Sequence, residues 1–237
     1  RRKSTYVCIS PGKFCLRGAI VLGVCGVGIP AAIQNLLNVT GMTILNNFTS
    51  AFGADAVAAM GITQKLYIVP MYVCMGMSQG IMPLVSYNYA SGNQKRMRSA
   101  VVFTGTVSIG FITAAALFFY VGAEGVVRFF MDNPSIIAYG IRFLRGFCLG
   151  LPFLCMDFLA VGVFQALGYG KNALVFAIMR KIVLEIPALY LLNYLFPLYG
   201  LAYAQFAAEF VLAVAAVIEL FLIFRRLGRK EAYVEDV

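Results

Sequence analysis

The segment 18-GAIVLGVCGVGIPAAIQNLLNVTGMTILNNFTSAFGA-54 contains no charged side chain. A bilayer core about 30 Å thick is crossed by roughly 20 apolar residues of α-helix, because each residue advances the helix by about 1.5 Å. The segment is therefore long enough to span a membrane. Soluble domains rarely contain even one such segment, so this one alone indicates a membrane protein.

Five further segments have the same character. The six candidate spans cover 18–52, 56–89, 99–121, 141–167, 173–195 and 200–224, and the whole chain is 61% hydrophobic and 12% charged. In lipid, backbone polar groups must be paired within a helix or a closed barrel, and the alternating pattern of a membrane barrel is absent. The sequence therefore predicts an all-α membrane protein built as a six-transmembrane-helix bundle.

Lys and Arg are distributed unevenly among the connections. They gather before the first span and after the second, fourth and sixth, as Arg1, Arg2, Lys3, Lys13, Arg17, Lys95, Arg96, Arg98, Lys171, Arg225, Arg226, Arg229 and Lys230. The other connections hold Arg128 beside Asp55, Glu124 and Asp132. Since loops rich in Lys and Arg stay in the cytoplasm, we expect both termini on the cytoplasmic side of a plasma or inner membrane.

This pattern divides the chain into a basic cytoplasmic linker (1–17), a transmembrane lobe (18–224) and a cytoplasmic tail (225–237). The net charge of +9 reflects membrane topology and attraction to anionic lipid heads, so we expect no nucleic-acid partner. The chain begins at Arg1 rather than at Met, and we expect it to be part of a longer protein.

Residues that usually carry catalysis are missing from the sequence. The chain has no His, which removes most acid/base triads and most zinc sites, and it has no Gly-Lys-Ser/Thr phosphate-binding loop. Its Cys residues lack the paired spacing of a metal site or disulfide framework. We therefore predict that the protein is not an enzyme and that it holds no metal site and no covalent cofactor.

Three acids inside the predicted spans are candidates for binding a substrate or a coupling ion, because a charge near the bilayer centre costs about 2.5–3.5 kcal/mol. Asp157 lies in the middle of the fourth span, without a basic residue within two helical turns along the chain. It suits an ion-coupled carrier, or is an Asp satisfied by hydrogen bonds between helices. Glu185 follows Lys181 by one turn and is open to neutralisation by it, whereas Glu209 is placed to face the bundle interior.

Amides form a second group of candidate binding residues. Gln34 and Asn38 share one face of the first span, and Gln64 lies in the second. These side chains either line a wet cavity, which we favour, or hold helices together at about 0.6 kcal/mol per hydrogen bond.

Prolines inside the spans predict bends, because each removes a backbone hydrogen bond. Pro30, Pro152 and Pro187 are the candidate hinges. Transporters that alternate between two states need such flexible points, although receptors and channels also contain kinked helices.

Several motifs together resemble the multidrug and toxic compound extrusion (MATE) family over about 18–224. They are GIPAAIQ (28–34), FGADAVAAMGI (52–62), Gln79-Gly80 followed by YNYASGN (87–93), FQALG (164–168) with Lys171, and Arg180 followed by Pro187. The GADA segment and the YNYASGN ending are the more specific part of this combination.

The resemblance implies a fold and a function. Members of the family have twelve helices in two lobes around a central cleft, and they export organic cations in exchange for H⁺ or Na⁺. This chain resembles helices seven to twelve, so the implied partners are a missing N-terminal six-helix lobe, amphipathic organic cations and the lipid bilayer. Some members carry an acid on the seventh helix, where this chain has Gln34. Asp157 lies in the helix where some relatives place another acid, and others use an Asp in the N-terminal lobe.

Two alternative functions remain. A flippase for a lipid-linked molecule on the same superfamily fold requires a strongly basic cavity, and the sequence shows few basic residues at depth. A passive channel would dissipate a gradient without exchange stoichiometry. An intramembrane enzyme is disfavoured because the acids lie on separate helices.

Overall fold

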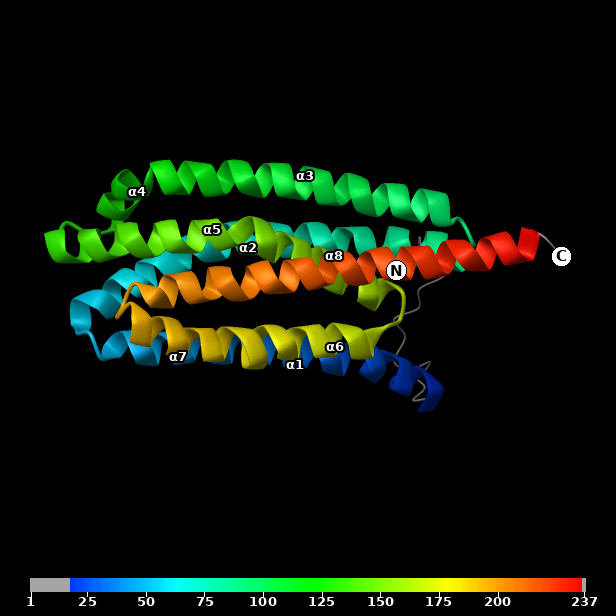
Figure 1. Ribbon diagram of the computed structural model, residues 1–237, viewed down its shortest axis with the longest axis horizontal. Helices are drawn as coiled ribbons and strands as arrows, with labels where there is room; N and C mark the ends of the chain where they lie inside the picture. Colours follow the sequence, from blue (N-terminus) through cyan, green and yellow to red (C-terminus); the bar gives the residue numbers. More distant parts are fainter. Residues whose placement is uncertain (1–17, 236–237) are drawn as a thin grey trace, which may run out of the picture.

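The computed structural model describes residues 18–235, and these residues form helices joined by short turns (Figure 1). In chain order they are α1 (Gly18–Ser50), α2 (Ala54–Ala90), α3 (Gln94–Val121), α4 (Ala123–Phe130), α5 (Pro134–Ala166), α6 (Gly170–Ile178), the π-helix η2 (Met179–Glu185), α7 (Ile186–Leu195) and α8 (Gly200–Glu235). Within residues 18–235, five helices are long and apolar enough to cross a membrane: α1, α2, α3, α5 and α8.

The sixth crossing is composite. The segments α6, η2 and α7 follow one another without a break and form one continuous rod beside α1 (Figure 1). Their combined length matches the predicted span 173–195. The prediction of an all-α membrane protein with six crossings is therefore confirmed.

Helix α5 is the centre of the bundle. Its apolar window is 78% buried inside the structure, whereas those of the other four spanning helices are at most 33% buried. It contacts α2, α3, α4, α6 and α8. Because α5 is surrounded by protein while its neighbours keep one face outward, a polar group on α5 is placed to meet partners from other helices rather than lipid.

Local sequence signals account for the helix ends. Gly92, at φ 74°, lies in the turn after α2, and the Asn93 side chain then accepts a hydrogen bond from the backbone N–H of Arg96 at 3.0 Å. Pro134 starts α5, where its missing N–H costs nothing, and the Asn133 side chain caps this helix by accepting from the backbone N–H of Ser135.

Small residues allow α5 to approach its neighbours closely. A Cβ added to Gly146 would lie 2.7 Å from the Cβ of Ala202 on α8. Toward α2, the Ser78 hydroxyl donates to the Phe158 carbonyl at 2.6 Å, beside Gly162. Close packing of small residues and hydrogen bonds between helices are the main sources of helix association in lipid.

The three candidate hinge prolines all lie inside helices. Pro30 has no N–H to donate to the Gly26 carbonyl, and α6 fills the space beside that carbonyl with Gly170, whose added Cβ would lie 2.7 Å from the Gly26 oxygen. Pro152 lies inside α5, and Pro187 follows directly after η2. A π-helical segment is rare and often marks a functional site, so the region before Pro187 is the least regular part of a crossing.

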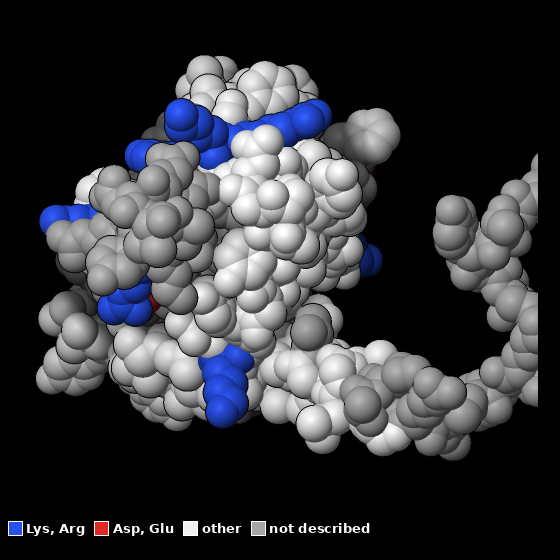
Figure 2. All heavy atoms as spheres, turned by 90° about the vertical axis from the view of Figure 1, so that its right-hand side faces the viewer, with Lys and Arg blue, Asp and Glu red and all other residues white. Residues whose placement is uncertain are grey.

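Basic residues gather at one end of the bundle. The start of α1, the α2–α3 and α5–α6 turns and the end of α8 all lie at the right-hand end of Figure 1, and Figure 2 views this end with its Lys and Arg side chains. Exposed basic residues there are Lys95, Arg96, Arg98, Lys171, Arg225 and Arg226. The predicted linker 1–17 lies outside the described residues, and residues 225–235 of the predicted tail continue α8 as a helix.

The opposite end holds more basic charge than the sequence reading assigned to it. That reading counted Arg142 and Arg145 within the fourth span, but α5 already begins at Pro134 and both side chains are exposed. Arg142 lies 4.5 Å from the Tyr199 ring centroid, and Arg145 donates to the Tyr120 carbonyl at 3.4 Å. The charge asymmetry between the two ends remains, but it is smaller than predicted.

Replacing Gly146 with Ala tests the close packing of α5 on α8. Because neither the new Cβ nor the Cβ of Ala202 can rotate away, we expect Gly146→Ala to lower the free energy of unfolding by about 1–3 kcal/mol. Gly110→Ala on α3 is the matched control, since a Cβ there meets nothing within 4 Å. Unfolding in mixed detergent micelles, followed by circular dichroism, measures both; equal stabilities would contradict the packing argument.

Candidate functional site

Five charged side chains are buried together inside the bundle, and we call them the charge cluster. They are Asp157 on α5, Arg180, Lys181 and Glu185 on η2, and Glu209 on α8, and each is at most 7% exposed. Moving an ion out of water costs several kcal/mol unless a partner compensates it. The pairing within the cluster therefore decides which charged side chain is buried without a compensating partner.

Asp157 is paired with Arg180. The Arg180 Nη1 donates to Asp157 Oδ2 at 2.9 Å, and its Nη2 donates to the Asn38 side-chain oxygen on α1. The guanidinium also lies 5.2 Å from the ring centroid of Phe158. The sequence reading found no basic residue near Asp157 because Arg180 lies 23 residues away along the chain. Asp157 is thus not an isolated charge, which corrects that reading.

Glu185 is paired with Lys181 one turn earlier. The Lys181 Nζ donates to both carboxylate oxygens, at 2.6 and 2.7 Å, so the structure contains the neutralising contact considered from sequence. Gly41 on α1 makes room for this pair, because a Cβ there would lie 3.0 Å from the Lys181 Nζ and 3.1 Å from a Glu185 oxygen. Helix α1 therefore lies directly against the cluster.

Glu209 is the carboxyl without a counter-ion. It is 0% exposed, and within the described part of the chain neither of its side-chain oxygens has a hydrogen-bond partner. The cluster contains two cations and three carboxyl groups, and both cations are bonded to the other two acids. A fully ionised cluster would therefore carry one buried negative charge on Glu209.

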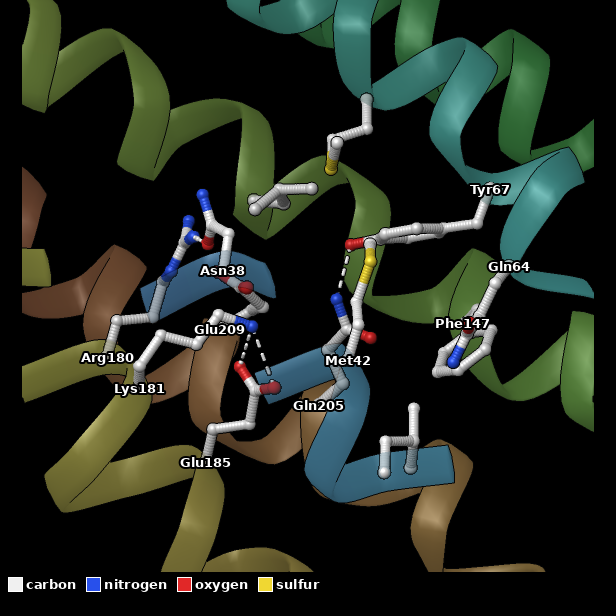
Figure 3. A pocket seen from close by; sticks show the side chains of 13 residues that line it. Asn38, Met42, Gln64, Tyr67, Phe147, Arg180, Lys181, Glu185, Gln205 and Glu209 are labelled. Atoms are coloured by element: carbon white, nitrogen blue, oxygen red, sulfur yellow. Dashed lines mark hydrogen bonds and ion pairs between the residues drawn. The ribbon is translucent and has the colours of Figure 1, made fainter. Parts of the chain in front are cut away.

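Glu209 lines a cavity that we call the charged cavity, with about 440 Å³ of empty space including its open mouth. Figure 3 shows Arg180, Lys181 and Glu185 projecting from one wall, and Asn38 and Met42 from α1. Other lining residues are Leu45, Gln64, Tyr67, Met71, Phe147, Leu154 and Gln205.

Two polar pairs frame the charged cavity. Gln205 donates to the Tyr67 hydroxyl at 2.5 Å, which joins α8 to α2. The amides of Gln64 and Asn46 bond each other at 3.1 and 3.4 Å, so Gln64 lines the cavity and also links α1 to α2. Sequence reasoning missed Tyr67, Gln205 and Asn46, because nothing in their local pattern distinguishes them from other polar residues in a span.

A second cavity, the amide cavity, lies on the other side of Asn38. It has about 480 Å³ of empty space and is lined by Ala31, Gln34, Asn35, Asn38, Met75, Ser78, Gln79, Met82, Phe158, Val161, Gly162 and Gln165. The structure thus places Gln34 and Asn38 on one wall, as their helical spacing indicated. Since Asn38 lines both cavities and bonds Arg180, it connects the amide cavity to the charge cluster.

The six candidate binding residues fall into three groups. Asp157, Glu185 and Glu209 belong to the charge cluster, Gln34 and Asn38 line the amide cavity, and Gln64 lines the charged cavity. Within residues 18–235, no group of three or more Cys, Asp or Glu side chains converges to hold a metal ion. The arrangement places an unpaired buried carboxyl in the charged cavity and connects it, through Asn38, with the uncharged amide cavity.

A double-mutant cycle tests the Asp157–Arg180 pair. Arg180→Gln leaves a buried carboxylate without its cation, so we expect a loss of about 3–5 kcal/mol of unfolding free energy, and Asp157→Asn/Arg180→Gln should recover part of it. The exposed pair Glu124–Arg128, tested with Glu124→Gln and Arg128→Gln, should show a coupling of at most about 1 kcal/mol. Additive losses at Asp157 and Arg180 would contradict the pairing.

Comparison with known proteins places this geometry in a family. The MatE family model matches residues 30–191. The multidrug export protein MepA of Staphylococcus saprophyticus subsp. saprophyticus is 30% identical over 227 residues, covering 95% of this chain and 50% of the relative. The MepA of Staphylococcus haemolyticus is 33% identical over 213 residues, covering 89% and 46%. The chain spans about half the length of the relatives that it matches.

Solved structures agree at the level of the fold. An outward-facing multidrug resistance MATE family transporter of the MOP superfamily superimposes with a TM-score of 0.88 at 19% identity, over 96% of this chain and 52% of that one. The Vibrio cholerae MATE transporter VcmN in its bent form gives 0.80 at 21% identity, over 91% and 49%. The fold is one lobe of a MATE-type transporter, and the chain belongs to the MatE family.

Proposed function

We propose that this chain is the C-terminal lobe of a secondary multidrug antiporter that exports organic cations in exchange for H⁺ or Na⁺. The observation that carries the proposal is the buried, unpaired Glu209 in a charge cluster joined through Asn38 to the amide cavity. The names of the MepA relatives, which are multidrug export proteins, support the same reading.

The amide cavity suits an amphipathic substrate. Its polar groups are neutral amides from α1, α2 and α5, and Met75, Met82 and Phe158 supply apolar contacts. Thioether side chains adapt to ligands of different shape, and an aromatic ring favours a nearby organic cation. Broad selectivity for amphipathic cations follows from such a lining, because no fixed ion pair within the cavity demands one particular ligand geometry.

Coupling requires a group whose ion affinity differs between two conformations, since an ion that binds both states equally does not drive exchange. A carboxyl inside the charge cluster meets this requirement when helix movement changes its distance from Arg180 or Lys181. Pro30, Pro152 and the η2–Pro187 region are the proposed points where the helices bend during that movement.

The rest of the transporter is an N-terminal lobe of six further helices. Helix α1 supports this partner, because its apolar window is 0% buried within this chain although the helix contributes to both cavities. We place both termini of the chain on the cytoplasmic side of a plasma or inner membrane, on the basis of the basic end seen in Figure 2. The bilayer and amphipathic organic cations are the other partners.

A flippase is less well supported, although one argument against it needs correction. The sequence reading found few basic residues at depth, whereas the structure buries both Arg180 and Lys181. Each is neutralised by a carboxylate, so the cavity is not the strongly basic one that an anionic lipid-linked substrate requires. A passive channel remains distinguishable by flux without exchange stoichiometry.

Efflux from vesicles tests the proposal. The chain, co-expressed with its upstream six-helix half, should drive efflux of a fluorescent organic cation under an imposed H⁺ or Na⁺ gradient. Asp157→Asn should abolish the gradient-driven part while membrane insertion stays normal, because Arg180 loses its partner in the cluster. Asp55→Asn, the same change at an exposed position, should have no effect. Unaltered efflux in Asp157→Asn would assign Asp157 a structural role.

A further inference from the structure

The charge cluster has three carboxyl groups but only two cations. Both cations are paired with other acids, so Glu209 has no counter-ion. An ionised carboxylate without a hydrogen bond, at 0% exposure, loses its hydration without compensation, which costs several kcal/mol. Protonation of Glu209 removes this cost, because a neutral Glu209 carries no charge. The cluster then contains two cations and two anions, which balance. The charge count of the cluster therefore favours a protonated Glu209.

The groups around Glu209 come from four elements. The charged side chains whose fields act on it are Arg180, Lys181 and Glu185 from η2 and Asp157 from α5. Tyr67 from α2 lies within the same electrostatic range, and Asn38 on α1 lines the same cavity as a neutral neighbour. Both cations are already bonded to other carboxylates, so an ionised Glu209 would have to compete for one of them.

Arg180 is the cation that is available for such a competition. Its Nε has no acceptor, and Asp157 Oδ1 has no donor, among the described residues, so the pair is held by one bond instead of the two that a guanidinium can form. Lys181, in contrast, contacts both oxygens of Glu185. An exchange of partners therefore breaks one ion-pair hydrogen bond at Arg180, whereas it would break two at Lys181.

We propose that Glu209 is the proton-binding carboxyl of this lobe, and that its deprotonation draws the Arg180 guanidinium from Asp157 toward Glu209. The proposal rests on the proposed antiport function and names its coupling residue. The step is a proton release: the Glu209 acid loses H⁺ to water in the charged cavity, and the resulting carboxylate takes Arg180 as its counter-ion. No other bond is made or broken covalently.

A proton fits this position better than Na⁺. A metal cation needs several oxygen ligands, and among the described residues no group of three or more Cys, Asp or Glu side chains converges to hold a metal ion. A proton requires no coordination shell, so it fits this geometry better.

Movement of Arg180 would carry the signal to the amide cavity. Its Nη2 now holds the Asn38 side chain, which lines that cavity. When the guanidinium turns toward α8, Asn38 loses this donor and is free to bond a substrate. Because Arg180 belongs to the π-helical segment η2, a small shift in backbone register is the proposed route for the movement.

Infrared difference spectroscopy of this chain, co-expressed with its upstream six-helix half and placed in lipid nanodiscs, tests the proposal without any transport. Raising the pH in Na⁺-free buffer should remove the carbonyl-stretch band of one protonated carboxyl. The band should be absent in Glu209→Gln and retained in Glu219→Gln, a matched change at a half-buried site on the same helix. A band that persists in Glu209→Gln, or no such band in the unaltered chain, overturns the proposal.

Two further arms test the cation and the Arg180 exchange. Na⁺ added at constant pH should leave the band unchanged, and its loss would assign the site to Na⁺ instead. In Asp157→Asn the band should disappear at lower pH, because Arg180 is then free to pair with Glu209; an unmoved titration overturns the exchange. If Glu209→Gln fails to fold, Glu209→Asp replaces it and should shift the frequency of the band. An unshifted band in Glu209→Asp would overturn the proposal.

A titration that behaves as expected together with absent efflux would reject the antiport function and keep the proton site. Intact gradient-driven efflux with no titration at Glu209 would reject the proton site and keep the antiport function. The two proposals therefore fail separately.

Discussion

The interior of the bundle depends on the hydrogen bonds of one side chain, Arg180 on η2. Its guanidinium donates to Asp157 on α5 and to Asn38 on α1. A single side chain thereby connects the composite crossing with both the central helix α5 and helix α1. The bundle has little hydrophobic driving force of its own in lipid, so contacts between helices come from close packing and polar bonds. Changing the partner of Arg180 would alter three crossings at once.

The helices were predictable from the sequence, whereas the pairing of their polar groups was not. A membrane span is recognised from a run of consecutive apolar residues. The composite crossing was therefore predicted as 173–195 although it contains three helical segments. The partner of Asp157 lies 23 residues along the chain, and the second partner of Arg180 lies 142 residues from it. The contact of Glu185 with Lys181 was predictable from sequence because the two residues are local neighbours.

The candidate binding residues show the same difference between what local sequence predicts and what only the tertiary structure reveals. Helical spacing was enough to place Gln34 and Asn38 on one face, but the amide cavity also needs Gln79 and Gln165 from two other helices. Likewise, Pro30 predicted the loss of a backbone hydrogen bond, while only the fold reveals that Gly170 lies against the Gly26 carbonyl. Local chemistry thus identifies which groups need a partner, and the tertiary structure decides which of them receive one.

The position of the charges on η2 has a physical reason. A regular helix fixes side chains by its own hydrogen bonds, so two buried cations on it would be held rigidly, whereas a π-helical turn before a proline has weaker constraints on register. The acids that compete for these cations include residues on the continuous helices α5 and α8. In the proposed exchange, a change of protonation at Glu209 moves Arg180 on η2 relative to the acids on α5 and α8.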